Sequence, residues 1–164
     1  MEKYRPRVIL SAAISLDGKI ATRTGDSKLS SQRDKIRVHK LRSKVDAILV
    51  GKNTLEIDDP LLTVRGVKGK NPVRVILDSR ATIRASSKIL RTCSKIPTII
   101  AVSKMAKKKN LEKLKKFPVV VKVCGNNKIN IKKLLKFLKE KKIKNLLVEG
   151  GGITNWSLIK ENLV

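Results

Sequence analysis

The chain has 164 residues, the size of one domain with a single substantial core. Its 41% hydrophobic content argues against a disordered protein, and no apolar stretch approaches the ~20 residues that a membrane span needs. The formal net charge is +26 and only four aromatic residues are present, so we expect an aliphatic core of Ile, Leu and Val.

In chain order, short apolar runs alternate with amphipathic segments. The first strand is expected over residues 7–15, followed by a helix over residues 31–45 that Ser31 caps, with Asp34 completing a capping box. Further strands are expected over residues 46–51, 73–79, 98–103, 119–124 and 145–152, and lysine-rich helices over residues 105–117 and 129–145. Near-continuous apolar strands between helices predict one α/β domain of three layers, with a mainly parallel sheet covered on both faces.

The positive charge is concentrated in one part of the chain. Between residues 101 and 145 there are sixteen lysines and two acidic residues. In the second lysine-rich helix, the apolar side chains of Ile131, Leu134, Leu135 and Leu138 share one stripe, so the lysines fall on the opposite face. We interpret them as a solvated surface. A nucleic-acid-binding module remains an alternative on charge, although residues that stack on bases are nearly absent.

Cysteine and histidine usage excludes several kinds of chemistry. Cys93 and Cys124 are far apart and form no CxxC motif, which is typical of a reducing cytoplasm without structural zinc or a disulfide. His39 is the only histidine, so a histidine-based catalytic triad is not expected, and neither is a metal site.

Unusual residues follow four of the predicted strands, where ligands bind in parallel α/β sheets. Ser15, Asp17 and Gly18 follow the first strand, and the adjacent acids Asp58 and Asp59 follow the second. Ser79 and Arg80, with Arg84 nearby, follow the third and offer donors suited to a ribose phosphate, although Asp78 would suit an unmodified ribose hydroxyl.

The last strand leads into three glycines and the start of a helix, in the sequence LLVEGGGITN. Glycines let backbone amides approach a diphosphate, and a helix N-terminus favours the anion. The GxxxxGK[ST] phosphate loop is absent, so ATP chemistry is not favoured.

Five motifs together carry a family resemblance: AAISLDGKIAT, GDSKLSSQRD, HKLRSKVDAILVGKNTLEIDDPLLTVR, NPVRVILDS and LLVEGGGITN. In this order and spacing the chain resembles the pyrimidine reductases of riboflavin biosynthesis, which have a dihydrofolate-reductase-like fold, and among them the stand-alone archaeal type. The resemblance implies NADPH as hydride donor, a ribosylaminopyrimidine 5′-phosphate as substrate, and conversion of its ribosyl side chain to the ribityl form. A homodimer is also expected.

The resemblance also implies roles for individual residues. The expected cofactor contacts are Ala13, Thr54, Asp58, Ser79, Gly150, Gly151, Gly152, Ile153 and Thr154, to which the phosphate-binding argument adds Arg80. The expected substrate contacts are Ser27, Arg42, Leu62, Arg65 and Glu149, with Arg42 and Arg65 suited to the phosphate and Glu149 to a polar edge of the sugar or pyrimidine. Asp58 is the candidate catalytic residue, whereas Asp59 is expected to brace the turn before Pro60.

Two departures from the family pattern stand out. Bacterial relatives often carry a tryptophan in the stretch that Lys28 and Leu29 occupy here, and the family domain continues with more strands beyond the position of Val164. We therefore expect residues 1–164 to form a single reductase domain that lacks those C-terminal strands. The alternative within enzymes is another NADPH-dependent reductase of dihydrofolate reductase type, but Arg33, Arg37 and Arg42 on the first helix suit a phosphorylated substrate better.

Overall fold

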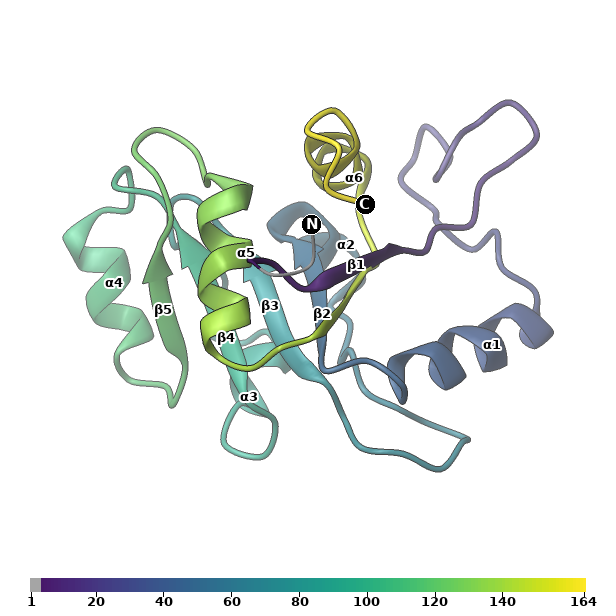
Figure 1. Ribbon diagram of the computed structural model, residues 1–164, viewed down its shortest axis with the longest axis horizontal. Helices are drawn as coiled ribbons and strands as arrows, with labels where there is room; N and C mark the ends of the chain where they lie inside the picture. Colours follow the sequence, from purple (N-terminus) through teal and green to yellow (C-terminus); the bar gives the residue numbers. More distant parts are fainter. Residues whose placement is uncertain (1–3) are drawn as a thin grey trace.

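The computed structural model describes residues 4–164, which form a six-stranded sheet between helices (Figure 1). The strand order is β1-β6-β2-β3-β4-β5 and every neighbouring pair is parallel. The strands are β1 (Arg7–Leu10), β2 (Ala47–Gly51), β3 (Val73–Leu77), β4 (Thr98–Val102), β5 (Val120–Val123) and β6 (Asn145–Val148). The α/β class predicted from the sequence is confirmed, and the sheet is parallel throughout.

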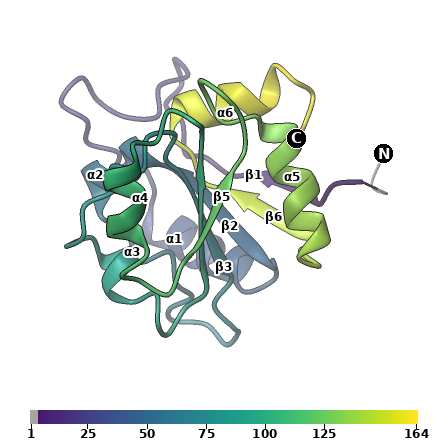
Figure 2. The same ribbon diagram turned by 90° about the vertical axis from the view of Figure 1, so that its left-hand side faces the viewer.

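Helices cover both faces of the sheet (Figure 2). Two aliphatic clusters fill the space between the layers. The helices are α1 (Gln32–Arg42), α2 (Lys52–Asp58), α3 (Lys88–Arg91), α4 (Lys108–Leu114), α5 (Ile131–Glu140) and α6 (Gly152–Ile159). One cluster joins α5 and α6 to the sheet, and the other joins α2, α3 and α4 to its opposite face. The stripe predicted on α5 is buried as expected.

The first strand is shorter than predicted, because its neighbour ends. β1 stops at Leu10, which pairs with Val148, the last residue of β6. Beyond that point the chain has no partner strand, and residues 11–31 form an irregular segment along the edge of the molecule. Ile14, which the sequence prediction placed in the strand, is 64% exposed.

The helix after this segment is capped as predicted, but only in part. The Ser31 hydroxyl accepts a hydrogen bond from the backbone N–H of Asp34. The Asp34 carboxylate does not complete the capping box by binding the Ser31 backbone N–H. It accepts a hydrogen bond from Arg37 Nε at 2.7 Å instead. α1 ends at Arg42 rather than Val45, and none of its residues is buried.

Two short helices, α2 and α3, were not predicted. α2 has seven residues with Leu55 as its only buried side chain, and α3 has four residues. Neither is long enough to show the repeated apolar spacing from which a helix is recognised. The segment after β2, expected to be a loop, is therefore a helix that fixes Thr54 and Asp58 at consecutive turns.

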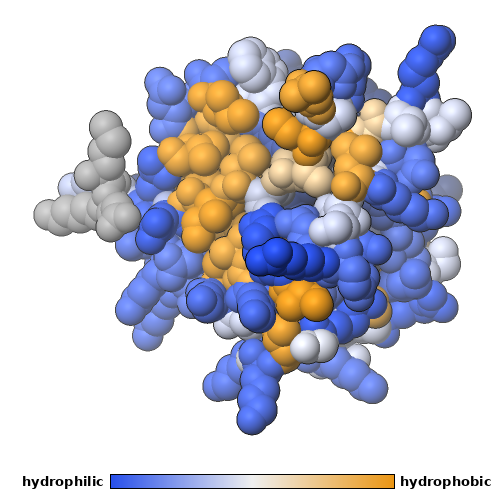
Figure 3. Space-filling view, turned by 90° about the vertical axis from the view of Figure 1, so that its right-hand side faces the viewer, coloured by the Kyte–Doolittle hydropathy of each residue, from blue (hydrophilic) through white to orange (hydrophobic). Residues whose placement is uncertain are grey.

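The β1 edge of the sheet carries no further strand within residues 4–164. Seen from the side of β1 and α1, the surface shows a broad band of apolar side chains interrupted by hydrophilic ones (Figure 3). Leu16 and Ile36, from the segments beside this edge, are among the exposed apolar residues. No helix within the described range is long and apolar enough to cross a membrane.

Candidate active site

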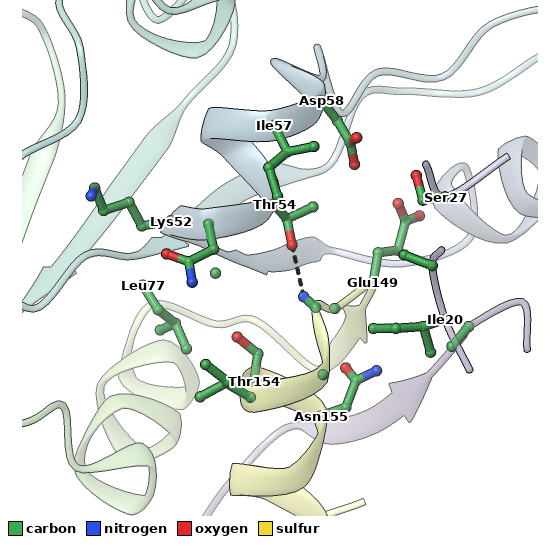
Figure 4. A pocket seen from close by; sticks show the side chains of 18 of the residues that line it. Ile20, Ser27, Lys52, Thr54, Ile57, Asp58, Leu77, Glu149, Thr154 and Asn155 are labelled. Atoms are coloured by element: carbon green, nitrogen blue, oxygen red, sulfur yellow. Dashed lines mark hydrogen bonds between the residues drawn. The ribbon is translucent and has the colours of Figure 1, made fainter. Parts of the chain in front are cut away.

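A cleft of about 1060 Å³ opens at the carboxyl ends of β1, β2, β3 and β6 (Figure 4). All the residues predicted for the site except Leu62 line it, so four separate stretches of sequence converge as the strand order requires. The turn after β6 and the start of α6 lie in the middle of the cleft. One arm extends towards the ends of β3 and α5, and the other towards α1 and residues 11–31.

The glycines after β6 allow three elements to meet closely. The Gly150 carbonyl accepts a hydrogen bond from the Gly51 N–H at 2.9 Å, and the Thr54 hydroxyl accepts one from the Gly151 N–H at 2.8 Å (Figure 4). A Cβ on Gly51 would lie 2.5 Å from Thr154 Oγ1. Because no side chain fits there, β2, α2 and α6 are held together through backbone and small polar groups.

The anion-binding amides differ by one position from the sequence prediction. Gly151 N–H, expected to face a diphosphate, is already bonded to Thr54. α6 begins at Gly152, has no side-chain cap, and leaves the first amides of the helix, those of Gly152, Ile153 and Thr154, without a partner among residues 4–164. These three amides form the positive end of an eight-residue helix that faces the cleft.

A second unsatisfied group lies beside them. Asn155 is 8% exposed, and its Oδ1 atom is buried without a hydrogen-bond partner within the described residues. Buried acceptors of this kind are rare in folded proteins unless a ligand or water satisfies them. Asn155 was not predicted as a site residue, because an asparagine inside a helix start gives no signal that separates it from a surface residue.

Asp58 and Asp59 have separate environments. Asp58 is the last residue of α2 and lines the cleft opposite Ser27 (Figure 4). Partial burial raises the pKa of its carboxyl, with the charge of Asp26 adding to the rise and the Ser27 hydroxyl opposing it. Within residues 4–164, the Asp58 carboxylate forms no ion pair.

Asp59 points away from the cleft and has a structural role, although not the predicted one. It caps the C-terminus of α2 in the left-handed region, with φ 38° and ψ 54°. Its Oδ1 atom accepts a hydrogen bond from Lys88 N–H at 2.9 Å, at the start of α3. The expected local turn bond is thus replaced by a contact that ties α2 to a helix 29 residues further along the chain.

Arg42 and Glu149, predicted as separate substrate contacts, are paired with each other. Arg42 Nε and Nη2 donate to the two carboxylate oxygens of Glu149 at 2.8 and 2.6 Å, and both side chains are about seven-eighths buried (12% and 13% exposed). Arg42 Nη1 also donates to the Thr63 carbonyl at 3.1 Å. Arg65 lies on the same arm of the cleft, where its exposed side chain has no hydrogen-bond partner among the described residues.

Leu62 is not among the residues that line the cleft, so its predicted contact with the substrate stays a prediction. Its side chain is 2% exposed and belongs to the core cluster on the α2 side of the sheet. Its φ of 54° places its backbone in the left-handed region. Arg65, three residues later, is exposed and lines the cleft.

In the turn after β3, Asp78 and Arg80 have different surroundings. Asp78 is 2% exposed, and its carboxylate accepts from the backbone amides of Thr82 and Ile83 at 2.6 and 2.8 Å. Both amides bind Oδ2, and the Thr82 hydroxyl lies 3.4 Å from Oδ1, so the buried Asp78 carboxylate stabilises the turn. Ser79 and Arg80 line the cleft, whereas Arg84 reaches the Glu56 carbonyl at 3.1 Å and does not.

The comparisons with known proteins agree with this geometry. The model of the family described as RibD C-terminal domain matches residues 6–164. The 2,5-diamino-6-ribosylamino-4(3H)-pyrimidinone 5′-phosphate reductase of Methanothermobacter thermautotrophicus is 44% identical over 98% of this chain and 74% of its own length. The reductase of the same name from Aquifex aeolicus is 41% identical over 98% of this chain and 73% of its own length.

Solved structures show the same fold. The RibD protein of Acinetobacter baumannii superimposes with a TM-score of 0.82 and 27% identity, over 99% of this chain and 44% of the RibD chain. The dihydrofolate-reductase-like α/β fold expected from the motifs is thus confirmed. The chain belongs to the RibD C-terminal domain family, the reductases of riboflavin biosynthesis.

Proposed function

We propose that the chain uses NADPH to reduce the ribosyl side chain of 2,5-diamino-6-ribosylamino-4(3H)-pyrimidinone 5′-phosphate to the ribityl form. The two relatives at 44% and 41% identity carry the name of this activity and align over nearly the whole chain. The observation that carries the proposal is the uncapped start of α6 between two arms of one cleft, because it offers an anion site where two ligands would meet.

The residues present fit a dinucleotide. Three helix amides without partners among residues 4–164 suit its diphosphate, and the buried Asn155 Oδ1 finds no donor in the same range, so a ligand could supply one. The arm beyond the diphosphate site is lined by Ser79, Arg80 and Lys128, whose hydroxyl and cationic groups suit a ribose 2′-phosphate. When bound, NADPH supplies the hydride for the reduction.

The other arm suits a phosphorylated pyrimidine nucleotide. Lys28, Lys35 and Arg65 line this part of the cleft without a side-chain partner among residues 4–164. We assign the substrate phosphate to Arg65, because a guanidinium can donate two hydrogen bonds to one phosphate. The buried Arg42–Glu149 pair fixes the floor of this arm rather than leaving Arg42 free for the phosphate. Ser27 faces the space between this arm and α2 (Figure 4).

Reduction at the anomeric carbon of the opened sugar adds a hydride and a proton. Of the acids lining the cleft, Asp34 is paired with Arg37, Glu149 with Arg42, and Asp78 is consumed by its turn. Asp58 is the remaining one, and partial burial raises the pKa of its carboxyl above the ordinary value. We assign Asp58 the role of proton donor or of the charge that orients the cofactor.

We also propose that the protein is a homodimer. The support is the β1 edge, which carries no further strand within residues 4–164 and is flanked by exposed apolar side chains (Figure 3). Sedimentation equilibrium measures the mass directly. A monomer at all concentrations up to the micromolar range would contradict the dimer and leave the enzymatic proposal intact.

The activity is tested by following NADPH oxidation with the diamino pyrimidine and with its deaminated counterpart. We expect oxidation with the diamino compound, in proportion to ribityl product. Oxidation with the deaminated compound alone would mean that the chain reduces the pyrimidine only after its deamination. Oxidation with neither, by folded protein, would contradict the proposed function.

A further inference from the structure

Helix α1 forms a wall of the substrate arm, and little apolar burial holds it there. None of its eleven residues is fully buried, Ile36 on its surface is 45% exposed, and Leu41 packs only partly buried against the core. Polar contacts that its cleft-facing side makes with other elements therefore contribute to its position. Two such contacts come from residues one helical turn apart, His39 and Arg42.

Both contacts bind the same segment of chain, residues 63–65. Arg42 Nη1 donates to the Thr63 carbonyl at 3.1 Å, while its other nitrogens bind Glu149. His39 Nδ1 accepts a hydrogen bond from the backbone N–H of Arg65 at 3.2 Å. One helix face thus holds this segment by an acceptor and a donor, and the segment presents Arg65 to the cleft.

We propose that His39 is a positioning residue for substrate binding: its neutral ring holds the Arg65 backbone against α1, so that the Arg65 guanidinium is directed at the substrate phosphate. This inference rests on the proposed function for the role of Arg65. In this role His39 acts through Arg65 rather than on the reacting atoms.

The surroundings of the ring favour the state that this role needs. Burial lowers the pKa of His39 below its usual 6.5, and the positive charges of Arg42 on α1 and Arg65 on the facing segment lower it further. The Thr63 carbonyl and the Glu149 carboxylate oppose the shift. At neutral pH the ring is therefore uncharged and Nδ1 can accept; below the lowered pKa, Nδ1 carries a proton and the bond to Arg65 is lost.

Because His39 is the only histidine, nuclear magnetic resonance of ¹⁵N-histidine-labelled protein gives one pair of ring signals. We expect the neutral ring to carry its proton on Nε2, with Nδ1 as hydrogen-bond acceptor, and to titrate below 6.5. A proton on Nδ1 in the neutral ring would overturn the proposal. This readout needs no substrate, so it decides the His39 geometry even if the proposed reaction fails.

Kinetics of three variants test the consequence. An Asn at position 39 places its amide oxygen where Nδ1 lies, so His39→Asn should keep the KM for the pyrimidine within about twofold, whereas His39→Ala should raise it about three- to tenfold, the range for losing one hydrogen bond. The KM for NADPH and kcat should change little in either. Lys40→Asn, on an exposed neighbouring position of α1, controls for the lower helix propensity of asparagine.

The pH profile separates positioning from a general structural effect. In the wild type, the pyrimidine KM should rise on acidification through the His39 pKa, beyond the change that the substrate phosphate itself causes. His39→Asn should show only the latter change. Equal losses in the Asn and Ala variants, no loss in Ala, or a wild-type KM that falls on acidification relative to Asn would each overturn the proposal. Failure of the wild type to reduce the pyrimidine would instead contradict the proposed function.

Discussion

Substitutions of the adjacent acids at the end of α2 should have different effects: those of Asp59 should change stability and that of Asp58 should change function. Asp59→Ala removes the acceptor of the Lys88 amide, which costs about 1 kcal/mol at this exposed site. It also forces alanine into the left-handed conformation that Asp59 adopts, at about 1–2 kcal/mol. Together the free energy of unfolding should fall by roughly 2–3 kcal/mol, or about 4–12 °C in Tm for a domain of this size.

Asparagine at the same position retains both properties, because its side-chain oxygen can accept and the residue tolerates the left-handed region. Asp59→Asn should therefore cost about 1 kcal/mol at most, with turnover per folded molecule unchanged. Asp58→Asn should leave Tm unchanged or slightly higher, since a carboxylate at a helix C-terminus is unfavourable. It should lower turnover or NADPH affinity about tenfold or more, equivalent to about 1.4 kcal/mol.

The assay combines thermal unfolding with steady-state kinetics on all three variants. The two readouts should divide cleanly, with Asp59→Ala changing Tm and Asp58→Asn changing kinetics. If Asp58→Asn turned over normally while Asp59→Asn were stable but inactive, the two roles would be reversed. If Asp59→Ala lost no stability, the contact with Lys88 would not connect α2 to α3 in solution.

Three further predictions concern the cofactor arm and the basic surface. Gly151→Val places a side chain against Thr54 Oγ1, which lies 3.0 Å from a Cβ at this position. The NADPH affinity measured by fluorescence titration should therefore fall at least tenfold while the circular dichroism spectrum stays unchanged. Unchanged affinity would remove the glycine turn from the cofactor site. In a Ser79→Ala, Arg80→Ala double variant, the preference for NADPH over NADH in kcat/KM should shrink, and an unaltered preference would place the 2′-phosphate elsewhere. Replacing four exposed lysines by glutamine should leave turnover within about twofold; the four are Lys107, Lys108, Lys132 and Lys133. A collapse of turnover in folded protein would mean that the basic face binds substrate.

Much of the fold follows from the sequence because parallel strands are buried on both faces. The runs that form β2, β3 and β4 are almost wholly apolar, and β6 starts where expected but ends at Val148, before the glycines that the predicted strand included. The limits of β1 do not follow from its own residues. They depend on where β6 ends, which is a property of a segment more than 130 residues away.

The sequence predicts which residues gather at the cleft better than it predicts the contacts between them. Strand ends must meet at one edge of a parallel sheet, so the convergence of Thr54, Ser79 and Glu149 follows from the strand order. The pairing of Arg42 with Glu149 spans 107 positions, and no local pattern indicates that the two compensate each other. Leu62 shows another limit: neither its burial nor its left-handed backbone, which no glycine marks, can be read from the local sequence.

The most direct test of the proposed reaction uses NADPH carrying deuterium at the transferable position. Product formed from the diamino pyrimidine should contain one deuterium, located by mass spectrometry and nuclear magnetic resonance at the former anomeric carbon of the ribityl chain. Product without the label, or a label at any other carbon, would contradict hydride transfer from NADPH to the sugar in this cleft.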